Sequence, residues 1–386
     1  MDNKSYFAID DFDEIYENYF KGISMWEALD ADISYWYNIT SKAIDILQIE
    51  GNAQYYRSDY SKGLSKEKEK ILYGLSQWES FDIHPTECTL CTSATMASLI
   101  VLTFLKRIGI QQIIFETPCY FASLIQAKLL GFEIILIPTY YSDHYSLKIG
   151  EDIFSNNKKK SIWLSQPRFA LGINQNANYI SDLYKHITNN DFIIIDEANE
   201  HIFPSTLRSL QPHSMSRIIR FKSLFKPLGL NGPRISCIFH NREYRSLFQD
   251  AMDVMQGGID YNSIALAVDL YSHPNNLSCA LERVHRQIID LKQKAEIITQ
   301  WSNIELSPLE NGYLGALHIH YNNDLTIEQN RYKLLTFCKK IEMPVILGAS
   351  MYYATEPNIE HIRLNYFIHD SLFLNGIESL AKHYSL

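Results

Sequence analysis

Short runs in which nearly every residue is apolar alternate with amphipathic stretches from about residue 110 onward. The apolar runs cover residues 113–115, 134–137, 162–164, 192–195, 218–221 and 235–239. Strands that are apolar at successive positions are typical of a parallel sheet that helices bury on both faces. The candidate helices between them are residues 94–106, 121–130 and 180–187. The pattern therefore predicts an α/β protein built on a mainly parallel sheet.

The pattern changes beyond Asn262, where residues 263–301 predict a long helical stretch that is interrupted near Pro274. A second, smaller α/β region follows. Its expected strands cover residues 314–320, 345–347 and 362–366, and its closing helix covers residues 372–383. We therefore expect a small domain that follows the large one.

The first fifty residues show no strong strand pattern and are expected to form an arm, or helices packed on the C-terminal region. The predicted organisation has three parts. Residues 1–50 form the N-terminal arm and part of the small domain, residues 51–270 the large domain, and residues 271–386 the rest of the small domain.

Composition places the chain of 386 residues among ordinary globular proteins, with 46% apolar and 20% charged residues. A formal net charge of -9, without a stripe of basic residues, argues against a nucleic-acid partner. No apolar segment is long enough for a transmembrane helix, and the N-terminus leads into acidic residues instead of a signal sequence. We therefore expect a cytoplasmic protein with no membrane partner. Six irregularly spaced cysteines predict reduced thiols.

Two of the apolar runs end in residues with distinctive chemistry. Asp196 follows residues 192–195, and Ser223, Lys226 and Arg234 follow residues 218–221. In open α/β sheets, ligands bind just outside the carboxyl ends of the strands. A surface lysine and arginine on a Gly/Pro-rich loop is the alternative explanation for the second group, and strand-end aspartates are common in α/β proteins. Their occurrence together favours a binding site.

In their order along the chain, these motifs resemble the class I/II aminotransferases, which are fold type I, aspartate-aminotransferase-like enzymes that depend on pyridoxal 5′-phosphate (PLP). The resemblance implies a seven-stranded, mainly parallel sheet between helices, with residues 51–270 as the PLP-binding domain. It implies that Lys226 forms the Schiff base and that Asp196 holds the pyridine nitrogen protonated. Ser223 and Arg234 would bind the cofactor phosphate.

Further segments resemble the same family. Ser93, Ala94 and Thr95 resemble the turn whose backbone N–H groups bind the phosphate at a helix N-terminus. Tyr120 resembles the aromatic residue that stacks on the cofactor and takes part in catalysis. Arg363 resembles the arginine that binds the carboxylate of an amino-acid substrate.

The family also completes its site across a homodimer interface. In the segment around residues 56–63, either Tyr56 or Tyr60 would reach the phosphate bound by the partner subunit. A homodimer with a shared active site is therefore implied by the resemblance.

The sequence departs from the family on the side of the cofactor that carries its phenolate oxygen. Phe169 occupies the place of an asparagine that donates to that oxygen, and Asn199 replaces a tyrosine that does the same. Arg168 or Asn199 could substitute as the donor, and Arg168 is also a candidate for substrate binding.

Three candidate functions of the chain remain. The first is an aminotransferase, and the second is a PLP lyase or cyclase that performs elimination, replacement or cyclisation of an amino acid. The third and least favoured is a non-catalytic binding protein. No metal is expected, because Cys88 and Cys91 lack further ligands and the pair of His318 and His320 lacks a third.

Overall fold

The computed structural model describes Ile23 and residues 65–150, 153, 158–230, 232–256, 258–321 and 324–385. Its largest element is a seven-stranded sheet in the order β1-β7-β6-β5-β4-β2-β3. The strands are β1 (Cys88–Cys91), β2 (Gln112–Thr117), β3 (Glu133–Pro138), β4 (Lys160–Ser165), β5 (Phe192–Asp196), β6 (Ile218–Ser223) and β7 (Ser236–Phe239). β7 runs antiparallel to both of its neighbours, while the pairs from β6 to β3 are parallel. The predicted mainly parallel sheet is confirmed.

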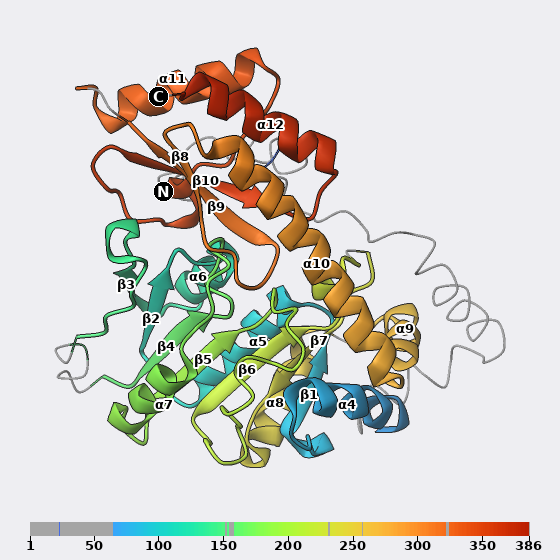
Figure 1. Ribbon diagram of the computed structural model, residues 1–386. Coiled ribbons are helices and arrows are strands. Elements are labelled where there is room, and N and C mark those ends of the chain that lie inside the picture. The colour runs from blue at the N-terminus through green and yellow to red at the C-terminus, as the bar shows by residue number, and fades with distance from the viewer. Residues whose placement is uncertain are drawn as a thin grey trace.

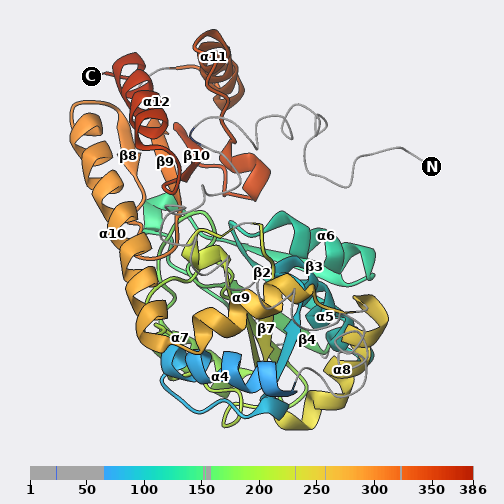
Figure 2. The ribbon, with the colours of Figure 1, turned by 90° about the vertical axis from the view of Figure 1, so that its right-hand side faces the viewer.

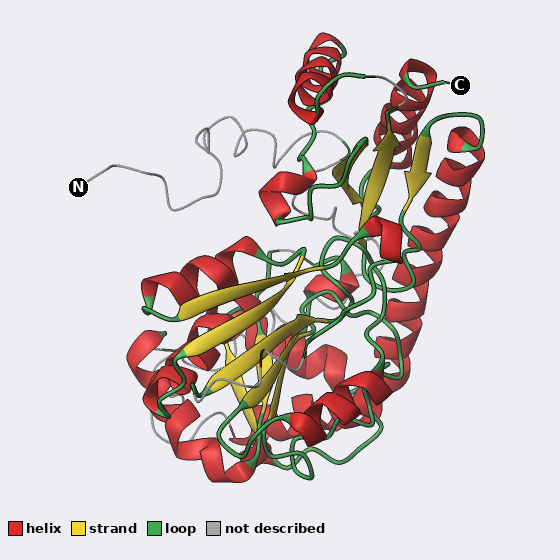
Figure 3. Cartoon of the chain, turned by 90° about the vertical axis from the view of Figure 1, so that its left-hand side faces the viewer, coloured by secondary structure: helices red, strands yellow, loops and turns green. Residues whose placement is uncertain are grey.

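Helices cover both faces of this sheet (Figures 1 and 3). They are α4 (Ser65–Glu79), α5 (Ala94–Arg107), α6 (Phe121–Leu129), α7 (Ala177–His186), α8 (Arg245–Met255) and α9 (Tyr261–Tyr271). The packing of β5, a strand in the middle of the sheet, explains why its run of residues is apolar at every position. Ile194 packs into a cluster with α5 and α8, while its neighbours Ile193 and Ile195 pack into a cluster with α7. Both sides of the strand are thus buried, as the sequence predicted.

The small domain holds a three-stranded sheet in the order β10-β9-β8, with both pairs antiparallel. Its elements are β8 (Ile304–Leu306), β9 (Leu314–His320), α11 (Ile327–Lys340), β10 (Ile359–Asn365) and α12 (Asp370–His383). The long helix α10 (Pro274–Thr299) runs from α9 beside the large sheet to this domain (Figure 2). The predicted break near Pro274 is confirmed, since α9 ends at Tyr271 and Pro274 begins α10. The exact domain boundaries remain a prediction.

The predicted strand at residues 345–347 is wrong. Only Leu347 pairs, as an isolated bridge to Ile362, and the Arg363 amide donates to the Ile346 carbonyl at 2.9 Å. The 3₁₀-helix η6 (Gly348–Met351) begins directly afterwards and ends the extended segment. The expected arm at residues 1–50 lies outside the described residues, apart from Ile23, whose carbonyl accepts from the Asn365 amide at 2.9 Å. None of the helices in the described ranges is long and apolar enough to cross a bilayer.

Candidate active site

One cavity at the carboxyl ends of the strands gathers the predicted cofactor residues. All ten lie on its wall: Ser93, Ala94, Thr95, Tyr120, Phe169, Asp196, Asn199, Ser223, Lys226 and Arg234. They come from segments that follow β1, β2, β4, β5 and β6, because parallel strands end at the same edge of the sheet. The cavity volume is about 160 Å³, which is enough for an organic ligand and far more than a single water molecule needs.

Lys226 begins the 3₁₀-helix η4 (Lys226–Leu228), three residues beyond β6. The Lys226 amide donates to the hydroxyl of Ser223 at 3.4 Å, which joins the strand end to this turn. Burial is the main cause that lowers the pKa of the Lys226 amine to about 8, with Asp196 opposing it and the positive charges of Arg363 and Arg234 adding to it. Roughly a tenth of this amine is therefore neutral, and so nucleophilic, at pH 7, far more than for an exposed lysine.

Asp196 ends β5 and faces the same cavity. Its carboxylate accepts the Ala198 amide at 2.9 Å, which fixes the turn after the strand. Burial raises the pKa of Asp196 to about 6, while this hydrogen bond and the charge of Lys226 oppose the rise. A cation held against this carboxylate would favour its ionised form.

The turn from β1 into α5 lines the cavity and presents a helix N-terminus to it. Ser93 caps α5, and its hydroxyl accepts the Met96 amide at 3.1 Å. The first N–H groups of a helix carry partial positive charge and attract anions. Ser223 and Arg234 border the same cavity and add a hydroxyl and a guanidinium. This set of donors suits a phosphate group.

Tyr120 lies between this turn and Phe169. Its hydroxyl is 3.2 Å from that of Thr95, and its ring centroid is 5.9 Å from that of Phe169. Burial raises the pKa of Tyr120, so the phenol stays protonated at neutral pH.

The two predicted substrate arginines lie outside the lining of the cavity. Arg168 is held by Glu116, with its Nε 3.2 Å from the Glu116 carboxylate, and it donates to the Tyr145 carbonyl. Arg363 is buried on β10, and its charge is close enough to lower the pKa of Lys226 and of Tyr120. Tyr56 and Tyr60 lie outside the described residues.

Sequence reasoning missed Tyr313 as a site residue. It precedes β9 in the small domain, lines the cavity, and its ring centroid is 5.9 Å from the Nζ of Lys226. The only local signal was the preceding Gly312, whose role depends on packing against residues far away in the sequence.

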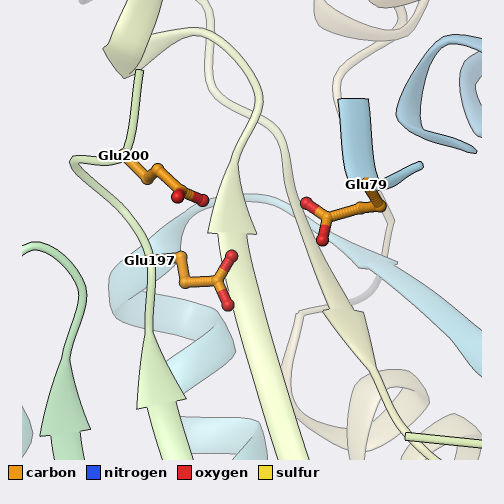
Figure 4. A group of neighbouring side chains, drawn as sticks. All are labelled: Glu79, Glu197 and Glu200. Atoms are coloured by element: carbon orange, nitrogen blue, oxygen red, sulfur yellow. The ribbon is translucent and has the colours of Figure 1, made fainter. Parts of the chain in front are cut away.

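Behind the site lies a group of five buried charged residues, which we call the ion cluster: Glu79, Glu197, Glu200, Arg220 and Lys222. Figure 4 shows the three glutamates with their carboxylates directed toward a common centre. The Nζ of Lys222 lies 2.6 Å from the Glu79 carboxylate, 2.7 Å from that of Glu200 and 3.3 Å from that of Glu197. The ammonium thus occupies the position that a metal ion would need.

Arg220 completes this cluster. Its Nη2 lies 2.5 Å from the Glu79 carboxylate and donates to the Glu197 carboxylate at 2.9 Å. Burial raises the pKa of Glu197 to about 7, against the charges of Arg220 and Lys222. Two cations therefore face three carboxylates, and Glu197 is protonated more easily than an exposed glutamate would be.

No protein-family model matches this sequence, and no curated protein sequence matches it either. Solved structures do match its fold. An aromatic aminotransferase from Pyrococcus horikoshii aligns with a TM-score of 0.77 at 15% identity, over 96% of this chain and 98% of that one. The chain has the aspartate-aminotransferase fold.

Other proteins with the aminotransferase fold align similarly. An aspartate aminotransferase variant from Thermus thermophilus gives a TM-score of 0.76 at 10% identity, over 96% of this chain and 94% of that one. YbdL, described as a methionine aminotransferase of Escherichia coli, gives 0.73 at 16% identity over 89% of each chain. At such identities the likeness establishes the aminotransferase fold, and the site residues have to carry the functional argument.

Proposed function

We propose that this chain is a PLP-dependent enzyme that acts at Cα of an L-amino acid, and that its reaction is amino transfer. One observation carries the proposal. Within an aminotransferase fold, a single cavity brings together the half-buried Lys226, a buried carboxylate and the N-terminus of a helix.

The cavity suits the chemical groups of PLP. The phosphate fits the end formed by Ser93, Ser223 and Arg234, the ring nitrogen fits Asp196, and the aldehyde fits Lys226. Asn199 supports this fit as well. Its side-chain oxygen is buried at the cavity wall and has no hydrogen-bond partner among the described residues. A buried polar atom of this kind usually indicates a missing partner.

When bound, PLP supplies an aldehyde that condenses with amines and a cationic ring that draws electrons from Cα. The chain supplies the rest. Asp196 would remain ionised beside a protonated ring nitrogen and keep that proton in place. Lys226, with its pKa near 8, would move the proton at Cα of the substrate. Arg363 would bind the substrate carboxylate from the small domain.

The proposal includes a homodimer with shared sites and a cytoplasmic location. The residue contributed by the partner subunit would be Tyr56 or Tyr60. Loss of the visible absorbance of the bound cofactor on dilution below the dimer dissociation constant would support the shared site.

The test begins with absorbance. We expect the purified protein to gain a visible band with PLP, and borohydride to fix the adduct on Lys226. Lys226→Ala should lose the adduct, while Lys185→Ala, which changes an exposed lysine in α7, should keep it. A protein that stays colourless with PLP would support the non-catalytic alternative and refute the proposal.

The reaction type is tested with a panel of amino acids, each incubated with and without an α-keto acid acceptor, and products are identified by mass. Amino transfer predicts a product that depends on the acceptor. A product formed without an acceptor would support elimination, replacement or cyclisation, the alternative raised by Phe169 and Asn199.

A further inference from the structure

Two buried histidines lie side by side on neighbouring strands of the small sheet. His318 on β9 and His361 on β10 are paired in the register of these strands, and their Nδ1 atoms lie 2.9 Å apart. The two rings meet edge to face, with an angle of 83° between their planes. The proposed function uses neither residue. Because an imidazole takes up a proton in mildly acidic solution, a buried pair of them is a candidate pH sensor.

A segment that follows β3 of the large sheet covers this pair. It contains the 3₁₀-helix η2 (Tyr141–Asp143) and ends at Tyr145, and we call residues 140–145 the covering segment. The Tyr145 hydroxyl lies 3.3 Å from Nε2 and 3.4 Å from Nδ1 of His318. The ring of Tyr141 lies against the same imidazole, with 4.8 Å between the ring centroids. The histidine pair is therefore part of the contact between the covering segment and the small domain.

The hydrogen bonds of the pair run in one direction. Burial raises the pKa of Tyr145, so its hydroxyl keeps its proton and can donate it. Nδ1 of His318 pairs with His361, which leaves Nε2 as the acceptor for Tyr145. Nδ1 of His318 then carries the proton and donates to Nδ1 of His361. The proton of His361 is on Nε2, which lies 3.9 Å from the Glu356 carboxylate. Each neutral ring thus accepts one hydrogen bond through its unprotonated nitrogen.

A further proton on either ring has to displace one of these hydrogen bonds, because it must bind the nitrogen that accepts. Burial lowers the pKa of His361 to about 4. Glu356 opposes this shift, whereas Arg331 and His320 add to it. Burial also lowers the pKa of His318 well below its usual range, and His361 and His320 lower it further. Both rings therefore stay neutral at physiological pH while the covering segment is in place.

Titratable groups face the pair from several elements. Besides Tyr145 they are Tyr141 in the covering segment, Glu305 on β8, His320 on β9, Arg331 on α11, and Tyr353 and Glu356 in the segment before β10. Of these, Glu356 is the carboxylate that favours a cation on His361. The loss of water around the buried rings outweighs its attraction.

The backbone of the covering segment is strained where it meets the pair. His144 and Tyr145 have φ of 48° and 56°, in the left-handed region that residues with side chains rarely adopt. Residues in such conformations persist only where surrounding contacts hold them. The guanidinium of Arg168 donates to the Tyr145 carbonyl, and the side chain of His318 meets the Tyr145 hydroxyl. Loss of the second contact would thus let this turn relax.

We propose that the pair of His318 and His361 is an acid-sensitive latch between the covering segment and the small domain. The latch is closed while both rings are neutral. A proton on either ring removes an acceptor and creates a buried cation, so the covering segment moves away and water reaches the charge. This inference goes beyond the proposed function and does not depend on a bound cofactor.

The sign and the size of the effect follow from proton linkage. In the released state each histidine is hydrated and has a pKa of roughly 6.5, whereas in the closed latch its pKa is much lower. Lowering the pH therefore favours the released state. Between about pH 7.5 and about pH 5.5, one histidine changes the ratio of released to closed molecules by about tenfold, and two change it by up to about a hundredfold.

The test is hydrogen exchange of the full chain, measured by mass spectrometry on peptides that cover residues 140–145. The amides of Tyr141 and Ser142 report opening, because they donate to the Glu356 carboxylate of the small domain at 2.7 and 3.0 Å. After correction for the intrinsic effect of pH, exchange should be at least about tenfold faster at about pH 5.5 than at about pH 7.5. Equal corrected rates would overturn the proposal.

Variants separate the pair from a general effect of acid. The double variant that combines His318→Gln with His361→Asn replaces both rings by amides, which form hydrogen bonds and do not titrate. Its corrected exchange should be the same at both pH values, and an acid response that persists would refute the latch. The matched control is His240→Gln, because His240 on β7 is also buried and burial lowers its pKa to about 4. This control should keep the acid response.

Tyr145→Phe tests the latch without changing a histidine, and it decides the question if the double variant does not fold. It removes only the hydroxyl that meets His318. The covering segment should then exchange faster at about pH 7.5 than in the unchanged protein, because the closed state has lost a hydrogen bond. Unchanged exchange in this variant would contradict the role of Tyr145 in holding the segment.

Discussion

Lys222 offers the sharpest test of the ion cluster behind the site. Its ammonium contacts three buried carboxylates, those of Glu79 and Glu200 at 2.6 and 2.7 Å and that of Glu197 at 3.3 Å. Lys222→Met preserves most of the side-chain volume and removes the charge. The cluster would then hold one cation against three carboxylates, all inaccessible to solvent. Removing one partner of a buried ion pair typically costs about 3–5 kcal/mol, and we expect a loss of that size.

The assay is urea denaturation of the PLP-free protein followed by tryptophan fluorescence. The double variant that combines Lys222→Met with Glu200→Gln should recover part of the lost stability, because it removes one uncompensated carboxylate. Lys185→Ala, which breaks an exposed pair with Asp182, should leave the midpoint unchanged. A loss in Lys222→Met below about 1 kcal/mol, the range of exposed pairs, would refute the reasoning.

The same variant should respond to pH in a defined direction. Without Lys222 the buried carboxylates hold protons more tightly in the folded than in the unfolded chain. The folded state then binds more protons, so its stability relative to the unchanged protein should fall as pH rises above the unfolded carboxylate pKa. If Lys222→Met lowered the free energy of unfolding equally at acidic and at neutral pH, this account would be contradicted.

Three further predictions concern packing and the site. Gly74→Ala should lower the thermal midpoint, because its Cβ would lie 2.3 Å from the Tyr271 carbonyl oxygen between α4 and α9; Gly232→Ala, with no atom within 4 Å of the added Cβ, should not. The rate at which PLP forms its visible band with the apo protein should rise with pH through about 8, because only the neutral Lys226 amine condenses; a rate that does not change with pH would contradict this pKa. Asp196→Asn should release PLP faster in dialysis, since an amide cannot hold the ring nitrogen charged, and unchanged retention would argue against that contact.

The large sheet could be predicted from the sequence because a strand that is buried on both faces is apolar at successive positions. Residues 192–195 are apolar at every position since helices cover both sides of β5. The short strand β8 was missed, because three residues carry too little pattern. The prediction of a strand at residues 345–347 was wrong for the opposite reason. All three residues are apolar, and Val345 and Ile346 are buried, but only Leu347 forms a bridge to the sheet.

The cofactor residues could be predicted because each follows an apolar run at the edge where the strands end. Tyr313 could not, since its place in the cavity depends on the contact of Gly312 with Asn199, more than a hundred positions earlier in the chain. The ion cluster could not be predicted from the sequence either. The partner of Arg220 at Glu79 is separated from it by 141 positions, and no local pattern joins them.

The charged residues of β6 also restrict how the large sheet can assemble. Arg220 and Lys222 point to the face of the glutamates, whereas Ile219 and Phe221, which alternate with them along the strand, pack with Trp163 on the opposite face. A shift of β6 by one residue would exchange the two faces. Both cations would then lie among apolar side chains, far from their carboxylates, at a desolvation cost of several kcal/mol for each ion. Mispaired arrangements of this strand are therefore disfavoured electrostatically, and the cluster selects one alignment during folding.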